Sequence, residues 1–480
     1  MAHDDPFTLD LFGASALSSG LGLGVAALAG GFVKDFDDDP DPTTPAPAAP
    51  SVRGARSNTA ARGRGVNFHL DGDRGLAAGW KDRARDNIAA IRLAGEIETA
   101  NRPATVEEQR KLIRFIGFGA GDLANAMFRR PGELEFRRGW QSLSAELQDA
   151  VSEVDYASLA RCTQYAHFTP EPIVRAIWRG LERLGWRGGS VLEPGIGTGL
   201  FAALTPEPLR ERTQFIGVEL DPSTARIARL LQPHARIIAG DFARMELSAR
   251  FDLAIGNPPF SDRIVRSDSA YRSLGLRLHD YFLARSIDLL KPGAFAAFVT
   301  SHGTMDKADA TARRHIAKSA DLVAAIRLPE GSFRADAGTN VVVDILFFRK
   351  RKPGETQGDL DWLEGAEVRA ATDDEGAIRV NRWFTGRPEF VLGEHALTSG
   401  PFGETYTCRS HASQPLHEAL AAAILLLPEA LYDGEPEVID PDADDNLADD
   451  PVDSSVDAAA DRCIEVAAAT RKTGCSGAAA

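Results

Sequence analysis

Apolar residues between positions 160 and 350 come in short runs that alternate with amphipathic stretches. The runs predict seven strands, at Ser190–Leu192, Gln214–Leu220, Arg236–Ala239, Phe251–Gly256, Ala294–Thr300, Leu322–Leu328 and Val341–Phe348. The stretches between them predict helices at Leu200–Leu204, Pro222–Leu231, Leu278–Leu290 and Asp306–Lys318. This alternation favours a doubly wound, mostly parallel α/β sheet. The seventh strand follows the sixth with room for only a turn or two of helix, so it can run antiparallel.

Helical periodicity precedes the alternating region. Lys81–Ala100 places its branched apolar residues near one face, and Pro170–Leu184 is a second amphipathic helix. Another helix is predicted at Thr105–Ile116, where Thr105 and Glu108 have the spacing of a capping box. These helices form a lead-in whose function the sequence does not reveal.

Composition separates the two ends of the chain from its body. Acid runs, a proline-alanine segment and an alanine-rich terminus predict disorder at both ends. The predicted segments are a disordered arm (1–65), a helical lead-in domain (66–160), a catalytic domain (161–352), a small C-terminal region (353–432) and a disordered acidic, alanine-rich tail (433–480).

The net charge of −15 over 480 residues also lies in the ends. Residues 1–50 carry −7, residues 433–461 carry −12 and residues 462–480 carry +2, which leaves +2 for residues 51–432. A nearly neutral body neither supports nor excludes a nucleic-acid partner. The four cysteines lack the spacing of a zinc site or a disulfide framework, which predicts no metal and a reducing, cytoplasmic location. No segment is hydrophobic enough to predict membrane insertion.

A glycine-rich loop closes the first predicted strand. It reads Glu193-Pro194-Gly195-Ile196-Gly197-Thr198-Gly199. A strand, such a loop and then a helix place backbone N–H groups beside a ligand that approaches closely. A nicotinamide-binding loop would need glycine at position 200, where Leu200 stands. Glycine-rich turns also arise for packing alone.

Two further acids follow the next strands. Glu219 ends the second predicted strand, where a carboxylate can accept hydrogen bonds from both hydroxyls of a ribose. Asp241 and Phe242 follow the third, where they can bind an adenine amine and cover its ring. Each acid alone is more often a surface or capping group, but their order after the glycine loop favours an adenosine-containing cofactor.

The tetrapeptide Asn257-Pro258-Pro259-Phe260 closes the fourth predicted strand. Proline cannot donate to a sheet, so carbonyl oxygens are left available at this strand end. The Asn257 side-chain oxygen and the Pro258 carbonyl can together accept both N–H bonds of an exocyclic amine, and Phe260 can stack on a base. The alternative is an ordinary proline turn at the end of a strand.

These motifs resemble those of γ-type N6-adenine DNA methyltransferases. The resemblance implies a Rossmann-like class I fold, S-adenosylmethionine as cofactor, DNA as substrate, and Asn257, Pro258, Pro259 and Phe260 as catalytic residues. The segment 164–170 resembles the motif that precedes the glycine loop in this family. By that resemblance Phe168 and Thr169 join Glu193, Pro194, Gly195, Gly197, Gly199, Glu219, Asp241 and Phe242 in the cofactor site.

Residues 66–435 resemble, more narrowly, the methyltransferase half of methylase-helicase proteins carried on plasmids and other mobile elements. The chain contains no G-x-x-x-x-G-K-[ST] sequence, so a helicase is expected only as a partner acting in trans. A γ-type enzyme places target recognition after the catalytic domain, and residues 353–432 are short for that task. Arg263, Arg266, Arg272 and Arg277, which follow the tetrapeptide, can hold a DNA backbone or can be solvated loop charges.

Two other functions stay open at this point. The tetrapeptide suits any planar amine, so the acceptor can instead be RNA or a glutamine amide of a protein. An accessory protein of a mobile element, one that binds DNA or counters restriction, can also retain the fold without catalysis.

Overall fold

The computed structural model describes residues 65–129, 135–164, 167–247, 250–372, 376–400, 403–411, 414–432 and 434. Almost all of the predicted arm (1–65) and tail (433–480) lies outside the described residues. The elements below all belong to one compact unit.

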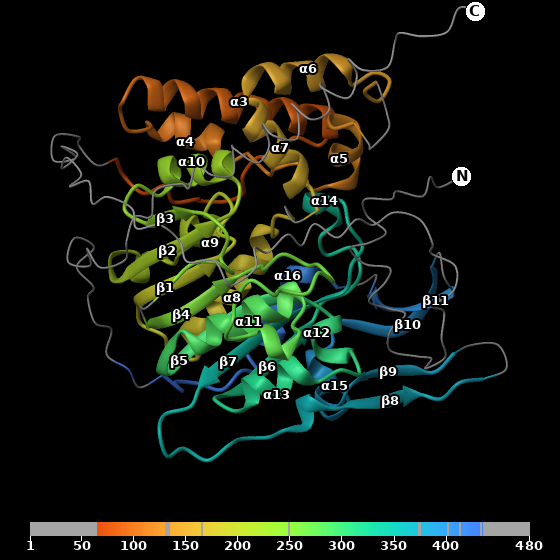
Figure 1. Ribbon diagram of the computed structural model, residues 1–480. Coiled ribbons are helices and arrows are strands. Elements are labelled where there is room, and N and C mark those ends of the chain that lie inside the picture. The colour runs from red at the N-terminus through yellow and green to blue at the C-terminus, as the bar shows by residue number, and fades with distance from the viewer. Residues whose placement is uncertain are drawn as a thin grey trace, which may run out of the picture. The chain divides into compact units, whose positions relative to one another are not determined.

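A seven-stranded sheet forms the centre of this unit (Figure 1). Its strands are β1 (Gly189–Pro194), β2 (Thr213–Glu219), β3 (Arg236–Ala239), β4 (Phe251–Gly256), β5 (Leu290–Ser301), β6 (Ala320–Arg327) and β7 (Val343–Lys350). They lie in the order β3-β2-β1-β4-β5-β7-β6, and β7 is antiparallel to both neighbours. The predicted mostly parallel sheet of seven strands is confirmed, including its antiparallel last strand. The strand order reverses between β1 and β4, and ligands bind at such a point in open α/β sheets.

Helices connect the strands. They are α8 (Glu171–Arg183), α9 (Leu200–Ala203), η2 (Glu207–Arg212), α10 (Pro222–Leu231), η3 (Arg272–Leu274), α11 (Leu278–Asp288), α12 (Gly303–Asp306), α13 (Thr311–Ala317) and α14 (Arg334–Ala337). The prediction of one helix at Asp306–Lys318 is wrong, because the chain leaves the helix between α12 and α13. There Lys307 pairs with Asp280 of α11, and Asp309 accepts hydrogen bonds from the backbone and hydroxyl of Thr311.

The lead-in consists of α3 (Trp80–Thr99), α4 (Val106–Leu112), α5 (Gly121–Met127), α6 (Gln141–Ala150) and α7 (Glu153–Cys162), which lie together beside α10 in Figure 1. The capping box between Thr105 and Glu108 is present. The helix predicted at Thr105–Ile116 ends earlier, at Leu112. After α4 the backbone bonds to Asn87 of α3 instead of continuing the helix. The Asn87 side chain accepts from Ile116 N at 2.9 Å and donates to the carbonyl of Gly117.

The C-terminal region forms two antiparallel ribbons, which sequence patterns did not predict. The remaining elements are η4 (Asp361–Leu363), β8 (Gly365–Arg369), β9 (Ile378–Asn381), α15 (Arg382–Gly386), η5 (Pro388–Phe390), β10 (Gly393–Gly400), β11 (Gly403–Ser410) and α16 (Leu416–Ile424). Strand β8 pairs with β9, and β10 pairs with β11. Within the described ranges, no helix is both long and apolar enough to cross a membrane.

Candidate functional site

A cavity of about 150 Å³ lies at the carboxyl ends of the central strands. Ten of the fourteen candidate residues line it: Phe168, Thr169, Glu193, Gly195, Gly197, Glu219, Asp241, Phe242, Asn257 and Pro259. Pro194, Gly199, Pro258 and Phe260 belong to the same turns but are not part of its lining. The cavity thus joins candidate residues from Phe168 to Pro259, which are 91 positions apart in the chain.

The glycine loop is held against β2 by its own backbone. Gly195 N and Ile196 N both donate to Val218 O, at 2.8 and 3.0 Å, and Gly197 N donates to Glu219 Oε2 at 2.9 Å. Gly197 has φ +58°, a left-handed conformation that side chains disfavour. A Cβ at this position would also lie 3.3 Å from the Phe168 ring. Glycine at 197 therefore leaves both the turn and the cavity wall undistorted.

A Gly197→Ala substitution separates these two effects when it is compared with Gly275→Ala. Gly275 also has φ +58°, but no atom lies within 4 Å of its Cβ position. Both variants are expected to lose about 1–2 kcal/mol of unfolding free energy, because both force alanine into a left-handed conformation. Only Gly197→Ala should also weaken S-adenosylmethionine binding by isothermal titration calorimetry. Equal cofactor affinities in the two variants would contradict a role for the space beside Phe168.

Two neighbouring carboxyl groups, those of Glu193 and Glu219, line the cavity. Glu193 is only 2% exposed, and its Oε2 has no hydrogen-bond partner in the part of the chain that the structure describes. Burial, and then the neighbouring Glu219, raise the pKa of Glu193 well above its usual value. Burial raises the pKa of Glu219 to about 7. Glu219 accepts from Gly197 N and from Asp221 N, at 2.9 and 3.0 Å, so its carboxyl group is fixed in place.

Asn257 has one satisfied and one unsatisfied side-chain atom. Its Nδ2 donates to His167 O at 2.9 Å, which fixes the orientation of the amide. Its Oδ1 is buried and accepts no hydrogen bond from the described residues. An unpaired buried acceptor is costly, so a site of this kind fits a ligand that brings an N–H group. Phe260 is 5% exposed and does not line the cavity, so its stacking role stays a prediction.

An aromatic wall closes the cavity beside Asp241. The Phe242 and Phe282 rings lie 4.9 Å apart, and the Arg285 guanidinium lies 4.7 Å from the Phe242 ring centre. Arg285 also donates to the carbonyl of Phe242. Sequence reasoning named Phe242 but missed its two partners on α11, whose positions depend on tertiary packing.

The lead-in region also contributes to the cavity lining. Phe118, Leu159 and Cys162 line the cavity, although no function was predicted for this region. Arg74, whose side chain is fully buried, donates to Glu171 Oε1 at 2.7 Å and to Thr169 O at 3.4 Å. Arg74 therefore holds the segment that carries Phe168 and Thr169, and an isolated arginine in the sequence carried no signal of this contact.

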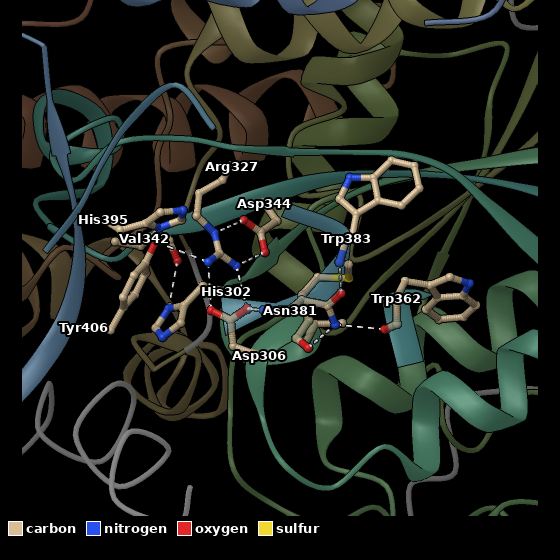
Figure 2. Close-up of polar contacts among 12 residues, drawn as sticks. His302, Asp306, Arg327, Val342, Asp344, Trp362, Asn381, Trp383, His395 and Tyr406 are labelled. Atoms are coloured by element: carbon tan, nitrogen blue, oxygen red, sulfur yellow. Dashed lines mark hydrogen bonds and ion pairs between the residues drawn. The ribbon is translucent and has the colours of Figure 1, made fainter. Parts of the chain in front are cut away.

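A second polar cluster lies at the ends of β5 and β6 (Figure 2). Fully buried Arg327 donates to both oxygens of Asp344, at 2.8 and 2.9 Å, and pairs with Asp306 at 2.8 Å. Its guanidinium also lies 4.2 Å from the Phe384 ring centre and donates to Tyr406 Oη at 3.2 Å. This cluster fixes α15 and the β10–β11 ribbon to the same edge of the sheet that holds the cavity.

Asn381 adds a second attachment of the C-terminal region. Its backbone N donates to Asp306, and its Nδ2 donates to the carbonyls of Met305 and Trp362, at 2.7 and 2.8 Å (Figure 2). Its Oδ1 accepts from Trp383 N, so all polar groups of this side chain are satisfied.

Residues 154–368 match the family described as N-6 DNA Methylase. Over 224 residues the chain is 28% identical to the defense against restriction protein B of Escherichia phage P1, which covers 45% of this chain and 10% of that protein. It is 30% identical over 192 residues to the type II methyltransferase M.CvrRI of Paramecium bursaria Chlorella virus XZ-6E. This alignment covers 39% of this chain and 48% of that protein. The structure of a type I restriction-modification system methyltransferase subunit from Streptococcus thermophilus aligns at 15% identity with a TM-score of 0.34. This alignment covers 56% of this chain and 66% of that chain.

The sheet, with its antiparallel seventh strand, and the cavity at its switch point have the arrangement of the class I S-adenosylmethionine-dependent methyltransferase fold. The similarity to the N-6 DNA methylase family extends over residues 154–368, which is less than half of the chain. The chain spans about half of the viral relative and a tenth of the phage relative.

Proposed function

We propose that this protein is a γ-type enzyme of the cytoplasm that transfers a methyl group from S-adenosylmethionine to the N6 amine of adenine in DNA. The observation that supports this most strongly is the buried, unpaired Asn257 Oδ1 in a cavity that also contains Glu193, Glu219 and Asp241. The resemblance to methylase-helicase proteins leads us to propose also that a helicase acts with it in trans.

The residues around the cavity fit the proposed cofactor. Glu219 would accept from the ribose hydroxyls, Asp241 would accept from the adenine amine, and Phe242 would support the ring. The glycine loop, Glu193, Phe168 and Thr169 would surround the methionine end, where carboxyl groups suit the positive charge. When bound, S-adenosylmethionine supplies an electrophilic methyl group.

Asn257 would orient the target amine. Its Oδ1 and the Pro258 carbonyl would accept the two N–H bonds, which takes the nitrogen lone pair out of conjugation with the ring. The hydrogen bond from Asn257 Nδ2 to His167 O would keep Oδ1 directed toward the target amine. Placing reacting atoms in this way needs no strong base.

Cofactor affinity is expected to rise with pH between about 6 and 8. Burial raises the pKa of Glu219 to about 7. The deprotonated carboxylate is an acceptor only and would accept from both ribose hydroxyls, whereas the protonated form has a hydrogen of its own to donate. Binding should therefore favour the deprotonated form and release protons below pH 7, which calorimetry in buffers of different ionisation enthalpy detects. Glu219→Gln should bind more weakly and remove most of this dependence; a pH dependence unchanged in the variant would assign it to another group.

Transfer of radiolabelled methyl groups tests the acceptor. Unmethylated duplex DNA, RNA and bulk protein are offered in parallel, and label is expected in DNA. Label in RNA or protein would show that the substrate is RNA or protein instead of DNA. If the protein binds S-adenosylmethionine but labels none of the three, the proposed activity is contradicted.

A further inference from the structure

The loop between the tetrapeptide and α11 is closed at its base. Leu278 N donates to Arg263 O at 2.9 Å, Val265 N donates to Leu276 O at 3.0 Å, and Ile264 forms an antiparallel bridge with Arg277. The Arg277 side chain pairs with Asp262 across the same base. Residues 263–265 therefore have a fixed backbone directly after the proposed catalytic segment.

The body of this loop is fastened to α11. Tyr271 Oη donates to Asp288 at 2.6 Å, and Tyr281 Oη donates to Asp268 at 2.7 Å. Both tyrosines are buried. A loop held at its base and along its length can present a side chain at a defined position, which a mobile loop cannot.

Two side chains at the base of the loop, those of Arg263 and Ile264, are exposed to solvent. Ile264 is 46% exposed, whereas the next residue, Val265, is 4% exposed. Arg263 is exposed and lines the cavity, and its guanidinium makes no hydrogen bond or ion pair with the residues that the structure describes. Leu220, an exposed large apolar residue that lines the cavity, follows Glu219 and lies at the proposed cofactor end, whereas Ile264 lies outside the lining.

We propose that Ile264 is an apolar wedge that enters the base stack where the target adenine leaves it, while Arg263 holds a neighbouring phosphate. This inference rests on the proposed function. A base inside a duplex must be flipped out before it reaches an enclosed site. Proteins that open a base step insert apolar side chains such as isoleucine, and arginine is suited to the flanking phosphate. Arg263 and Ile264 place both groups on consecutive residues beside the cavity.

The test compares a paired with an unpaired target. Once the methylated sequence has been read from methylated DNA, two duplexes are made, one with the target adenine opposite thymine and one with it opposite an abasic site. Ile264→Ala is expected to lose at least about tenfold in kcat/KM on the paired duplex and less than about threefold on the other, because no base pair then has to open. Ile264→Leu should stay near wild type on both.

Leu425→Ala is the control, because Leu425 is 66% exposed and lies at the end of α16, outside the cavity lining. It should match wild type on both duplexes. An Ile264→Ala variant that methylates the paired duplex like wild type, or that loses equally on both duplexes, would overturn the wedge. Wild-type protein that labels neither duplex would overturn the proposed function first, and the wedge with it.

Discussion

Asn257→Ala is expected to lower the rate of methyl transfer at least about a hundredfold while S-adenosylmethionine affinity stays within a few-fold. The substitution removes the buried Oδ1 that would accept from the target amine, together with the Nδ2 bond to His167 O. It leaves the glycine loop and the carboxyl groups of Glu193 and Glu219 unchanged. A single-turnover assay gives the rate, and calorimetry gives the affinity.

Asn67→Ala is the matched control for this prediction. The Asn67 side chain likewise makes one hydrogen bond, in which it accepts from His234 N at 2.9 Å, but Asn67 does not line the cavity. It should keep the wild-type rate. If Asn257→Ala transfers methyl groups as fast as wild type, the proposed orientation of the amine is wrong.

Arg327→Met is expected to cost about 3–5 kcal/mol of unfolding free energy, the largest stability loss of the substitutions considered. Asp344 is fully buried, and Asp306 has a side chain only 10% exposed. Without the guanidinium both carboxylates lose their positive partner, and the β10–β11 ribbon loses its bond from Arg327 to Tyr406. Urea denaturation measures the loss.

Two further variants test whether the stability loss of Arg327→Met comes from leaving buried carboxylates unpaired or only from lost contacts. Arg382→Ala breaks an exposed pair with Glu364, whose side chains are 48% and 61% exposed, and should cost less than about 1 kcal/mol. The double variant Arg327→Met/Asp344→Leu should recover part of the loss, because it removes one unpaired buried carboxylate. An Arg327→Met protein as stable as wild type would show that the cluster contributes little.

The sheet was predictable because its strands are buried on both faces and read as short apolar runs. The lone antiparallel strand followed from the short connection before β7, where α14 has only four residues. The break between α12 and α13 was not predictable, since it depends on Lys307 meeting Asp280 from another helix. The Arg327 cluster joins residues more than 70 positions apart, and no local pattern carries that information.

The proposed site shows the same division. Spacing alone indicated the strand-end residues Glu193, Glu219, Asp241 and Asn257, because parallel strands bring their carboxyl ends to one edge. It did not indicate His167 as the partner of Asn257, nor the lead-in residues that line the cavity. Those contacts arise only when segments distant in the chain pack against the sheet.

Mass spectrometry of nucleosides tests whether the protein methylates adenine in DNA through Asn257. Unmethylated duplex DNA is incubated with S-adenosylmethionine and either wild-type protein or Asn257→Ala, digested, and compared with synthetic methylated nucleosides. We expect N6-methyl-2′-deoxyadenosine with wild-type protein and none above background with the variant. A methylated cytosine in place of methylated adenine, or equal N6-methyladenine from both proteins, would contradict it.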